Sequence, residues 1–221
     1  MSTKGIPVAC CSSKKIISEF CYKDLFIKFV ASPQIAPRDG FTYYKPDDTI
    51  PGEHKTWRDL VLEQNHPDLV PAYCLYRRDI YRDLYHEFGN CFYILSAGWG
   101  IIRADFKIPA YDITYSTTPN MPEYAKRRDN YGWKDINHLK EDSIKFDRDS
   151  EVILFAGSDY VPPFCDMAQS VQYRKKILYK RHTVTRRQGF VYEYYQTNRN
   201  TNWYYEAVKR FLRDNERTRC I

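Results

Sequence analysis

The chain has 221 residues, a length that fits one medium-sized domain and argues against two full ones. Its net charge of +6 is the difference between 34 basic and 28 acidic residues, so the placement of the excess matters more than its size. No stretch is apolar for long enough to span a bilayer, so no membrane partner is expected.

Twenty tyrosines and seven cysteines are the unusual features of the composition. Tyrosine combines a flat stacking face with a hydroxyl group, which suits nucleic acid and equally suits the surface of a β-rich protein. The cysteines are odd in number and none forms a C-x-x-C pair, which argues against a zinc site. Without a secretory leader, they indicate a reduced, cytoplasmic protein. No metal or cofactor is expected.

The first element is a predicted strand over residues 5–11, followed by the polar, basic turn Ser12-Ser13-Lys14-Lys15. Hydroxyl groups, ammonium groups and backbone amides at a strand end suit a phosphate, but the turn lacks the glycines of a P-loop and equally fits a solvated connection. Residues 16–31 are apolar enough for either a strand or a helix. Residues 32–51 carry prolines, glycines and polar residues, which predict a long loop.

Two helices are predicted next, over residues 54–64 and 74–88, because their apolar residues recur at helical spacing. In the second helix, four apolar side chains form the expected inner stripe, and the arginines lie on or near the outer face. The stripe consists of Leu75, Ile80, Leu84 and Phe88.

Residues 92–116 are the most informative stretch. A strand-like run at residues 92–95 enters a turn of small residues at 96–100, and Pro109-Ala110-Tyr111-Asp112 then places an acid beside an aromatic ring. Ligands of open α/β sheets bind outside the carboxyl ends of strands, so this stretch predicts an active site. The alternative is an ordinary turn with a capping aspartate. Its candidate residues are Ser96, Gly98, Trp99, Gly100, Tyr111 and Asp112.

Residues 117–149 are polar and include a predicted helix with Trp133 and Leu139. The basic triplet at residues 126–128 fits a solvated face better than a nucleic-acid contact. Residues 151–156 then form the clearest buried strand, which ends in Gly157-Ser158-Asp159-Tyr160. This repeats the order of strand, small turn, acid and tyrosine, so Asp112 and Asp159 are expected to face one cleft if neighbouring parallel strands carry the two turns. Alternatively, Asp159 caps a helix.

The C-terminal part is expected to be a basic, aromatic hairpin followed by an amphipathic helix over residues 201–214. Basic and aromatic residues alternate before a turn at Gln188-Gly189, a pattern that favours contact with a nucleic-acid backbone over an idle solvated surface. The candidate nucleic-acid-binding residues are Arg174, Lys175, Lys176, Lys180, Arg181, Arg186 and Arg187.

Three strings resemble a bacterial and phage domain family of unknown function: IPVACCSSKK, YILSAGWGIIRADFKIPAYDITYS and VILFAGSDY. The family pattern is C-S-x-K-K, I-L-S-A-x-x-G-L, Y-D-x-T and A-G-x-x-Y, and the match spans about residues 6–165. Similar strings occur in YaaA peroxide-stress proteins and in archaeosine synthase. The resemblance implies DNA protection or base modification on a uracil-DNA-glycosylase-like α/β fold, with a mostly parallel central sheet flanked by helices. Its matched residues are Ser12, Lys14, Ser96, Gly100, Tyr111, Asp112, Gly157 and Tyr160.

Together these features predict a single domain over residues 1–221, with a core at about 6–170 and a basic extension at 171–221. The expected activity is that of a DNA glycosylase that flips and excises a modified base, with a role in phage defence following from the resemblance. Aromatic rings at Trp99, Tyr111 and Tyr160 would stack on the base, and Asp112, or else Asp159, would stabilise positive charge on the sugar. The alternatives are a non-catalytic DNA-binding protein of stress protection and a base-modifying transferase. The base recognised, the strand preference and the oligomeric state stay open.

Overall fold

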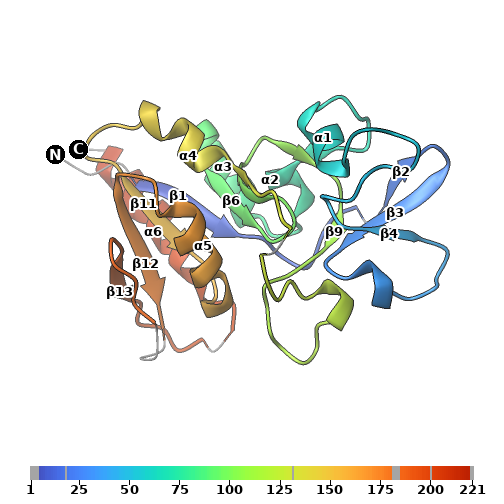
Figure 1. Cartoon of the computed structure of the whole chain (residues 1–221). Coiled ribbons are helices and arrows are strands. Elements are labelled where there is room, and N and C mark those ends of the chain that lie inside the picture. The colour runs from blue at the N-terminus through green and yellow to red at the C-terminus, as the bar shows by residue number, and fades with distance from the viewer. Residues whose placement is uncertain (1–4, 18, 131, 181–184, 200, 220–221) are drawn as a thin grey trace.

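The computed structural model describes residues 5–17, 19–130, 132–180, 185–199 and 201–219, and these form an α/β protein (Figure 1). In this part of the chain, seven strands build the central sheet in the order β10-β7-β6-β1-β11-β12-β13. Neighbouring strands are parallel except for β6 and β7, which confirms the predicted α/β class with a mostly parallel sheet. The strands are β1 (Gly5–Cys10), β6 (Tyr93–Ser96), β7 (Gly100–Arg103), β10 (Ile136–Asn137), β11 (Glu151–Phe155), β12 (Arg174–Tyr179) and β13 (Val191–Tyr194).

Helices cover both faces of the central sheet (Figure 1). On one face, α3 (Ile80–Phe88) and α6 (Trp203–Arg219) contact each other and pack on β1 and β11. On the other face, α4 (His138–Asp142) and α5 (Val161–Ala168) contact each other and β7. Every residue of β6 and β11 is buried, as expected for strands that are covered from both sides.

Strand β1 lies at the centre of the sheet, between β6 and β11. The connection from β1 to β6 runs through α3, whereas α5, which follows β11, lies on the opposite face (Figure 1). The winding of the chain therefore reverses around β1. In open α/β sheets such a reversal leaves a crevice at the carboxyl ends of the strands, which is where ligands bind.

A smaller sheet lies beside the central one, at the right of Figure 1. Within the described residues it has four strands, and β3 pairs with β2, β4 and β9. Its core is aromatic, because the Trp57 ring contacts the rings of Phe20 and Phe29. The sequence pattern did not decide between strand and helix for residues 16–31, and two strands, β2 and β3, lie within this range. The sheet contains β2 (Phe20–Tyr22), β3 (Leu25–Val30), β4 (Thr42–Tyr44) and β9 (Tyr111–Asp112), and α1 (Trp57–Leu62) packs beside it.

Short elements complete the chain. Strands β5 (Val70–Pro71) and β8 (Lys107–Ile108) pair with each other, and α2 (Ala72–Leu75) precedes α3. The 3-10 helices are η1 (Pro33–Ile35), η2 (Gly89–Cys91), η3 (Glu123–Ala125), η4 (Ser143–Lys145) and η5 (Ser158–Tyr160). The predicted loop over residues 32–51 therefore also contains η1 and β4.

The predicted helices at residues 54–64, 74–88 and 201–214 are confirmed, although the second is broken into α2 and α3. Helix α1 begins after Thr56, whose hydroxyl accepts the Asp59 amide proton in a capping box. The helix predicted to include both Trp133 and Leu139 is wrong for Trp133, because α4 begins at His138.

The predicted C-terminal hairpin is wrong. Strands β12 and β13 pair in parallel, with Lys176 opposite Val191, whereas a hairpin requires an antiparallel pair. Strand β12 is an interior strand, because it also pairs with β11. In this position its apolar residues Ile177 and Leu178 are buried, which an exposed hairpin would not allow. The basic segment is therefore part of the central sheet and not an appended ribbon.

Substitution of Gly100 by alanine is predicted to destabilise the protein by about 3 kcal/mol. Gly100 has φ +95°, and an added Cβ would lie 2.2 Å from the Ile136 carbonyl oxygen. Urea unfolding measures the effect. The control is Gly157→Ala, since no atom lies within 4 Å of that added Cβ; an equal loss in both variants would contradict the steric argument.

Stability is predicted to fall with acid because of His138. Its Nδ1 accepts the Arg103 amide proton at 3.1 Å, and burial, helped by the Arg103 charge, lowers its pKa to about 4. This stabilisation is complete above the ordinary pKa of 6.5 and is lost as the pH falls toward 4, by about 2 kcal/mol at pH 5. Urea unfolding at pH 7.5 and pH 5 compares the wild type with His138→Asn, which keeps an acceptor but does not titrate. Parallel losses in the two proteins would assign the pH dependence to other groups.

Candidate functional site

Polar side chains gather at the carboxyl ends of β1 and β6 and in the turn after β11. We call them the strand-end cluster. Residues from the far ends of the chain meet here, because β1 is flanked by β6 and β11 while β9 approaches from the smaller sheet. The cluster consists of Cys11, Lys15, Tyr76, Ser96, Tyr111, Thr114 and Tyr160.

One half of the cluster is centred on Tyr111. The Ser96 hydroxyl donates to the Tyr111 hydroxyl at 2.9 Å, and the hydroxyls of Tyr111 and Tyr76 are 2.8 Å apart. Burial raises the pKa of both tyrosines well above the usual value, so they remain neutral. Tyr111 is thus held by its hydroxyl and is only 4% exposed, which leaves little of its ring for stacking.

The other half is centred on Tyr160. Its hydroxyl lies 3.3 Å from the Cys11 Sγ and 3.3 Å from the Thr114 hydroxyl. Lys15 lies nearby, with its Nζ 4.3 Å from the centre of the Tyr111 ring. Burial lowers the pKa of Lys15, while Cys11 and Asp112 act in the opposite direction. Sequence reasoning chose Lys14 and missed Lys15, which is the lysine that contacts the cluster.

The turn after β1 separates the two lysines. Lys14 is exposed, and its amide donates to the Ser12 hydroxyl at 3.3 Å, whereas Lys15 faces the cluster. Ser12 is half-buried. The two lysines of the basic turn therefore differ: Lys14 points outward, and Lys15 packs over an aromatic ring.

The turn between β6 and β7 does not have the predicted ligand-binding role. Trp99 is fully buried against Phe29, with ring centres 5.4 Å apart, so it cannot stack on a base. Gly98 and Gly100 are also buried, and their missing side chains make room for Tyr111 and for the Ile136 backbone, respectively. The small residues admit other parts of the same chain and not a ligand.

Two buried arginines hold the carbonyl groups of that turn. Arg58 donates to the Gly98 carbonyl at 3.2 Å and is paired with Asp47 at 2.7 Å. Arg127 donates to the Ala97 carbonyl at 2.9 Å and is paired with Asp135 at 2.6 Å. The basic triplet 126–128 is therefore not a solvated face, since Lys126 and Arg127 are both buried.

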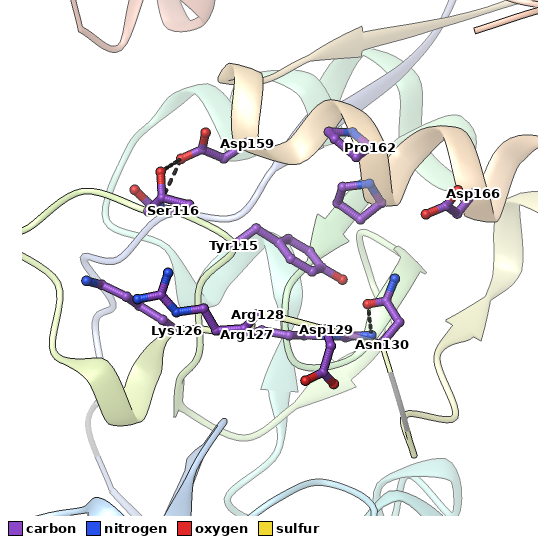
Figure 2. A pocket seen from close by; sticks show the side chains of 12 residues that line it. Tyr115, Ser116, Lys126, Arg127, Arg128, Asp129, Asn130, Asp159, Pro162 and Asp166 are labelled. Carbon is purple, nitrogen blue, oxygen red and sulfur yellow. Dashed lines mark hydrogen bonds between the residues drawn. The ribbon is translucent and has the colours of Figure 1, made fainter. Parts of the chain in front are cut away.

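A pocket of about 320 Å³ adjoins the cluster, between the segment 115–130 and the start of α5 (Figure 2). We call it the loop pocket. It touches the strand-end cluster through Tyr115, whose ring packs edge-on against that of Tyr160 at 5.3 Å. Small-molecule sites begin at roughly this volume. Its lining residues are Tyr115, Ser116, Thr117, Lys126, Arg127, Arg128, Asp129, Asn130, Asp159, Pro162, Pro163 and Asp166.

The two candidate carboxylates differ in their position. Asp159 lines the loop pocket, and its Oδ2 accepts the Thr117 amide proton at 2.9 Å and the Thr117 hydroxyl proton at 3.3 Å. Asp112 is exposed at the end of β9, beside Tyr124 and Lys15, and is not among the pocket residues. Asp159 makes no cap for η5 or α5, so the capping alternative is wrong.

The predicted nucleic-acid ribbon carries few unpaired charges. Lys175 is 6% exposed and donates to the Val171 carbonyl, so it cannot contact a phosphate. Arg174 and Lys176 both pair with Glu151, and Arg187 pairs with Asp166. Lys180 donates to the Arg199 carbonyl, and the Arg186 guanidinium lies 5.8 Å from the Tyr192 ring. Arg181 lies outside the described residues.

Across the described parts of the chain, no three His, Cys, Asp or Glu side chains lie close enough together to hold a metal ion. No helix in those parts has the length and apolar character needed to cross a membrane. The fold and site thus define an α/β protein with a pocket beside the turn that follows β11. Comparison with protein-family models, curated proteins and solved structures finds no match to this chain.

Substitution of Ser96 by alanine is predicted to destabilise the protein by about 1–3 kcal/mol. The Ser96 hydroxyl accepts the Trp99 amide proton at 3.2 Å and donates to Tyr111, so its removal leaves two buried groups without this partner. Urea unfolding measures the loss. Ser13→Ala is the control because Ser13 is exposed, and equal stability of both variants would show that the bonds contribute nothing.

Proposed function

We propose that this protein is an enzyme that cleaves the N-glycosidic bond of a base flipped out of DNA. The observation that carries the proposal is the loop pocket: it lies beside the turn after β11, has a volume of about 320 Å³, and includes the carboxylate of Asp159. A flipped base needs an enclosed pocket with polar groups for its edge. Cleavage of its glycosidic bond needs a carboxylate close to the sugar.

Asp159 takes precedence over Asp112 for this role, because it lines the pocket while Asp112 does not. The Thr117 amide and hydroxyl fix its side chain through Oδ2. A carboxylate held in this way stabilises positive charge on the sugar or orients a water molecule for attack on C1′. The base leaves with the bonding electrons and takes up a proton.

Contact with DNA is assigned to the pocket rim and not to the C-terminal strands. The Arg128 side chain is 58% exposed at the pocket, and Lys14 is exposed in the turn after β1. Arg128 lines the loop pocket, and its ion pair with Glu123 is exposed on both sides, so that pair restrains it only weakly; Lys175, in contrast, is buried, and Arg174 and Lys176 pair with the buried Glu151. Such rim charges hold phosphates without reading sequence.

The finer assignments rest on the resemblance of the sequence motifs. They are a uracil-DNA-glycosylase-like fold, a cytoplasmic location and a role in defence against phages with modified bases. The doubly wound sheet with its site beside β1 is in keeping with such a fold.

The test is incubation of the purified protein with plain and base-modified phage DNA, followed by mass spectrometry of released bases and an assay for abasic sites. Asp159→Asn is expected to lower base release by about 100-fold or more, because the charge is lost while an acceptor for Thr117 remains. Asp112→Asn is expected to retain most of the release.

The opposite ranking would move the catalytic role to Asp112. Binding of every DNA without release would favour the non-catalytic protein of stress protection. Incorporation of a labelled free base into DNA would favour a base-modifying transferase.

A further inference from the structure

Two buried hydrogen-bond donors in the loop pocket have no partner among the described residues. They are the hydroxyl of Tyr115 and the Nε of Arg127, and both residues line the pocket. A buried donor that loses water without gaining a partner costs about 1–3 kcal/mol. A ligand bound in the pocket could supply the missing acceptor to both.

The other hydrogen bonds of Arg127 show that only one of its donors lacks a partner. Its guanidinium has five N–H groups, and Nη1 and Nη2 bond to the Ala97 carbonyl, the Asn130 side chain and both oxygens of Asp135. Its side chain is 0% exposed. Four donors therefore fix the guanidinium rigidly, and only Nε–H is left over.

Tyr115 presents the second donor. The residue is 8% exposed, and burial is the main cause that raises the pKa of its hydroxyl, which therefore keeps its proton. Figure 2 shows its ring extending between Pro162 and Asn130, with the hydroxyl at the far end. The Arg127 guanidinium lies 5.1 Å from the centre of this ring, so the two side chains that carry the donors are in contact.

We propose that the loop pocket recognises the oxo group of a nucleobase, with the Tyr115 hydroxyl and the Arg127 Nε–H as its donors. The substrate class is then a base with an exocyclic carbonyl, such as an oxopurine or an oxopyrimidine. Adenine, which carries an amino group at the corresponding position, is disfavoured because a donor would face two donors.

The charges of the pocket favour a neutral acceptor over an anion. Its lining contains three basic side chains and three carboxylates, and the basic ones are already paired: Lys126 and Arg128 with Glu123, and Arg127 with Asp135. A phosphate would meet Asp159 and Asp166 without an unpaired cation to compensate. A carbonyl oxygen needs only the two donors.

This inference rests on the proposed function for its setting in DNA, but binding of free nucleosides tests it directly. Isothermal titration calorimetry and ligand-observed NMR use the pair deoxyinosine and deoxyadenosine, which differ at C6 by oxo against amino, with deoxyuridine and inorganic phosphate as further probes. Deoxyinosine and deoxyuridine are expected to bind, with deoxyadenosine at least about tenfold weaker.

The variant Tyr115→Phe distinguishes a role of the hydroxyl in binding the base from a role in the stability of the protein. Removal of an unpartnered buried hydroxyl is expected to leave the free energy of unfolding unchanged or higher, while deoxyinosine binds about tenfold more weakly and the preference over deoxyadenosine disappears. Tyr85→Phe is the matched control, because the Tyr85 ring stacks on Tyr73 and is not part of the pocket lining.

Three results would each overturn the inference: no nucleoside binding, equal binding of deoxyinosine and deoxyadenosine, or unchanged binding by Tyr115→Phe. Displacement of deoxyinosine by inorganic phosphate would likewise overturn it in favour of an anion site. If the protein releases bases from DNA without preferring oxo bases, this inference is wrong and the proposed function stands. If it binds oxo nucleosides selectively but releases no base, the proposed function is wrong and this inference stands.

Discussion

The hydrogen bonds from two buried arginines to the turn between β6 and β7 are the interaction on which the rest of the structure depends. Arg58 comes from α1, beside the smaller sheet, and Arg127 comes from the segment that lines the pocket. Both donate to carbonyl groups of one turn, and each is neutralised by an aspartate. Buried charges are costly unless pairs and hydrogen bonds satisfy them, and here those bonds determine where two outlying parts of the chain attach to the central sheet.

This attachment also determines where chemistry is possible. The carbonyl oxygens of Ala97 and Gly98 are occupied by arginines, and Trp99 is sealed in the core, so the turn itself is closed to ligands. The same bonds hold Arg127 in the wall of the loop pocket. They use every N–H group of its guanidinium except Nε–H. The proposed base site is thus a by-product of the bonds that fasten the segment to the sheet.

Local patterns in the sequence predicted the fold class, the strands β1 and β11 and the helix α6, because hydrophobic periodicity reports burial directly. Ser96, Tyr111 and Tyr160 were also selected, and all three lie in the strand-end cluster. The failures were of another kind. The roles of Lys15 and Arg127 depend on contacts with residues far away in sequence, and the parallel pairing of β12 and β13 depends on which strand takes the sheet edge. The spacing of residues along the sequence predicts neither these long-range contacts nor the order of the strands.

The bond between Cys11 and Tyr160 joins residues that are 149 positions apart in sequence. Closing so large a loop carries an entropic cost that only the assembled sheet offsets. Tyr111 and Thr114 reach the same cluster from the smaller sheet and the segment after it. The cluster therefore requires both sheets to be in place. A nascent chain that stops before β11 lacks Tyr160, so it cannot complete the cluster.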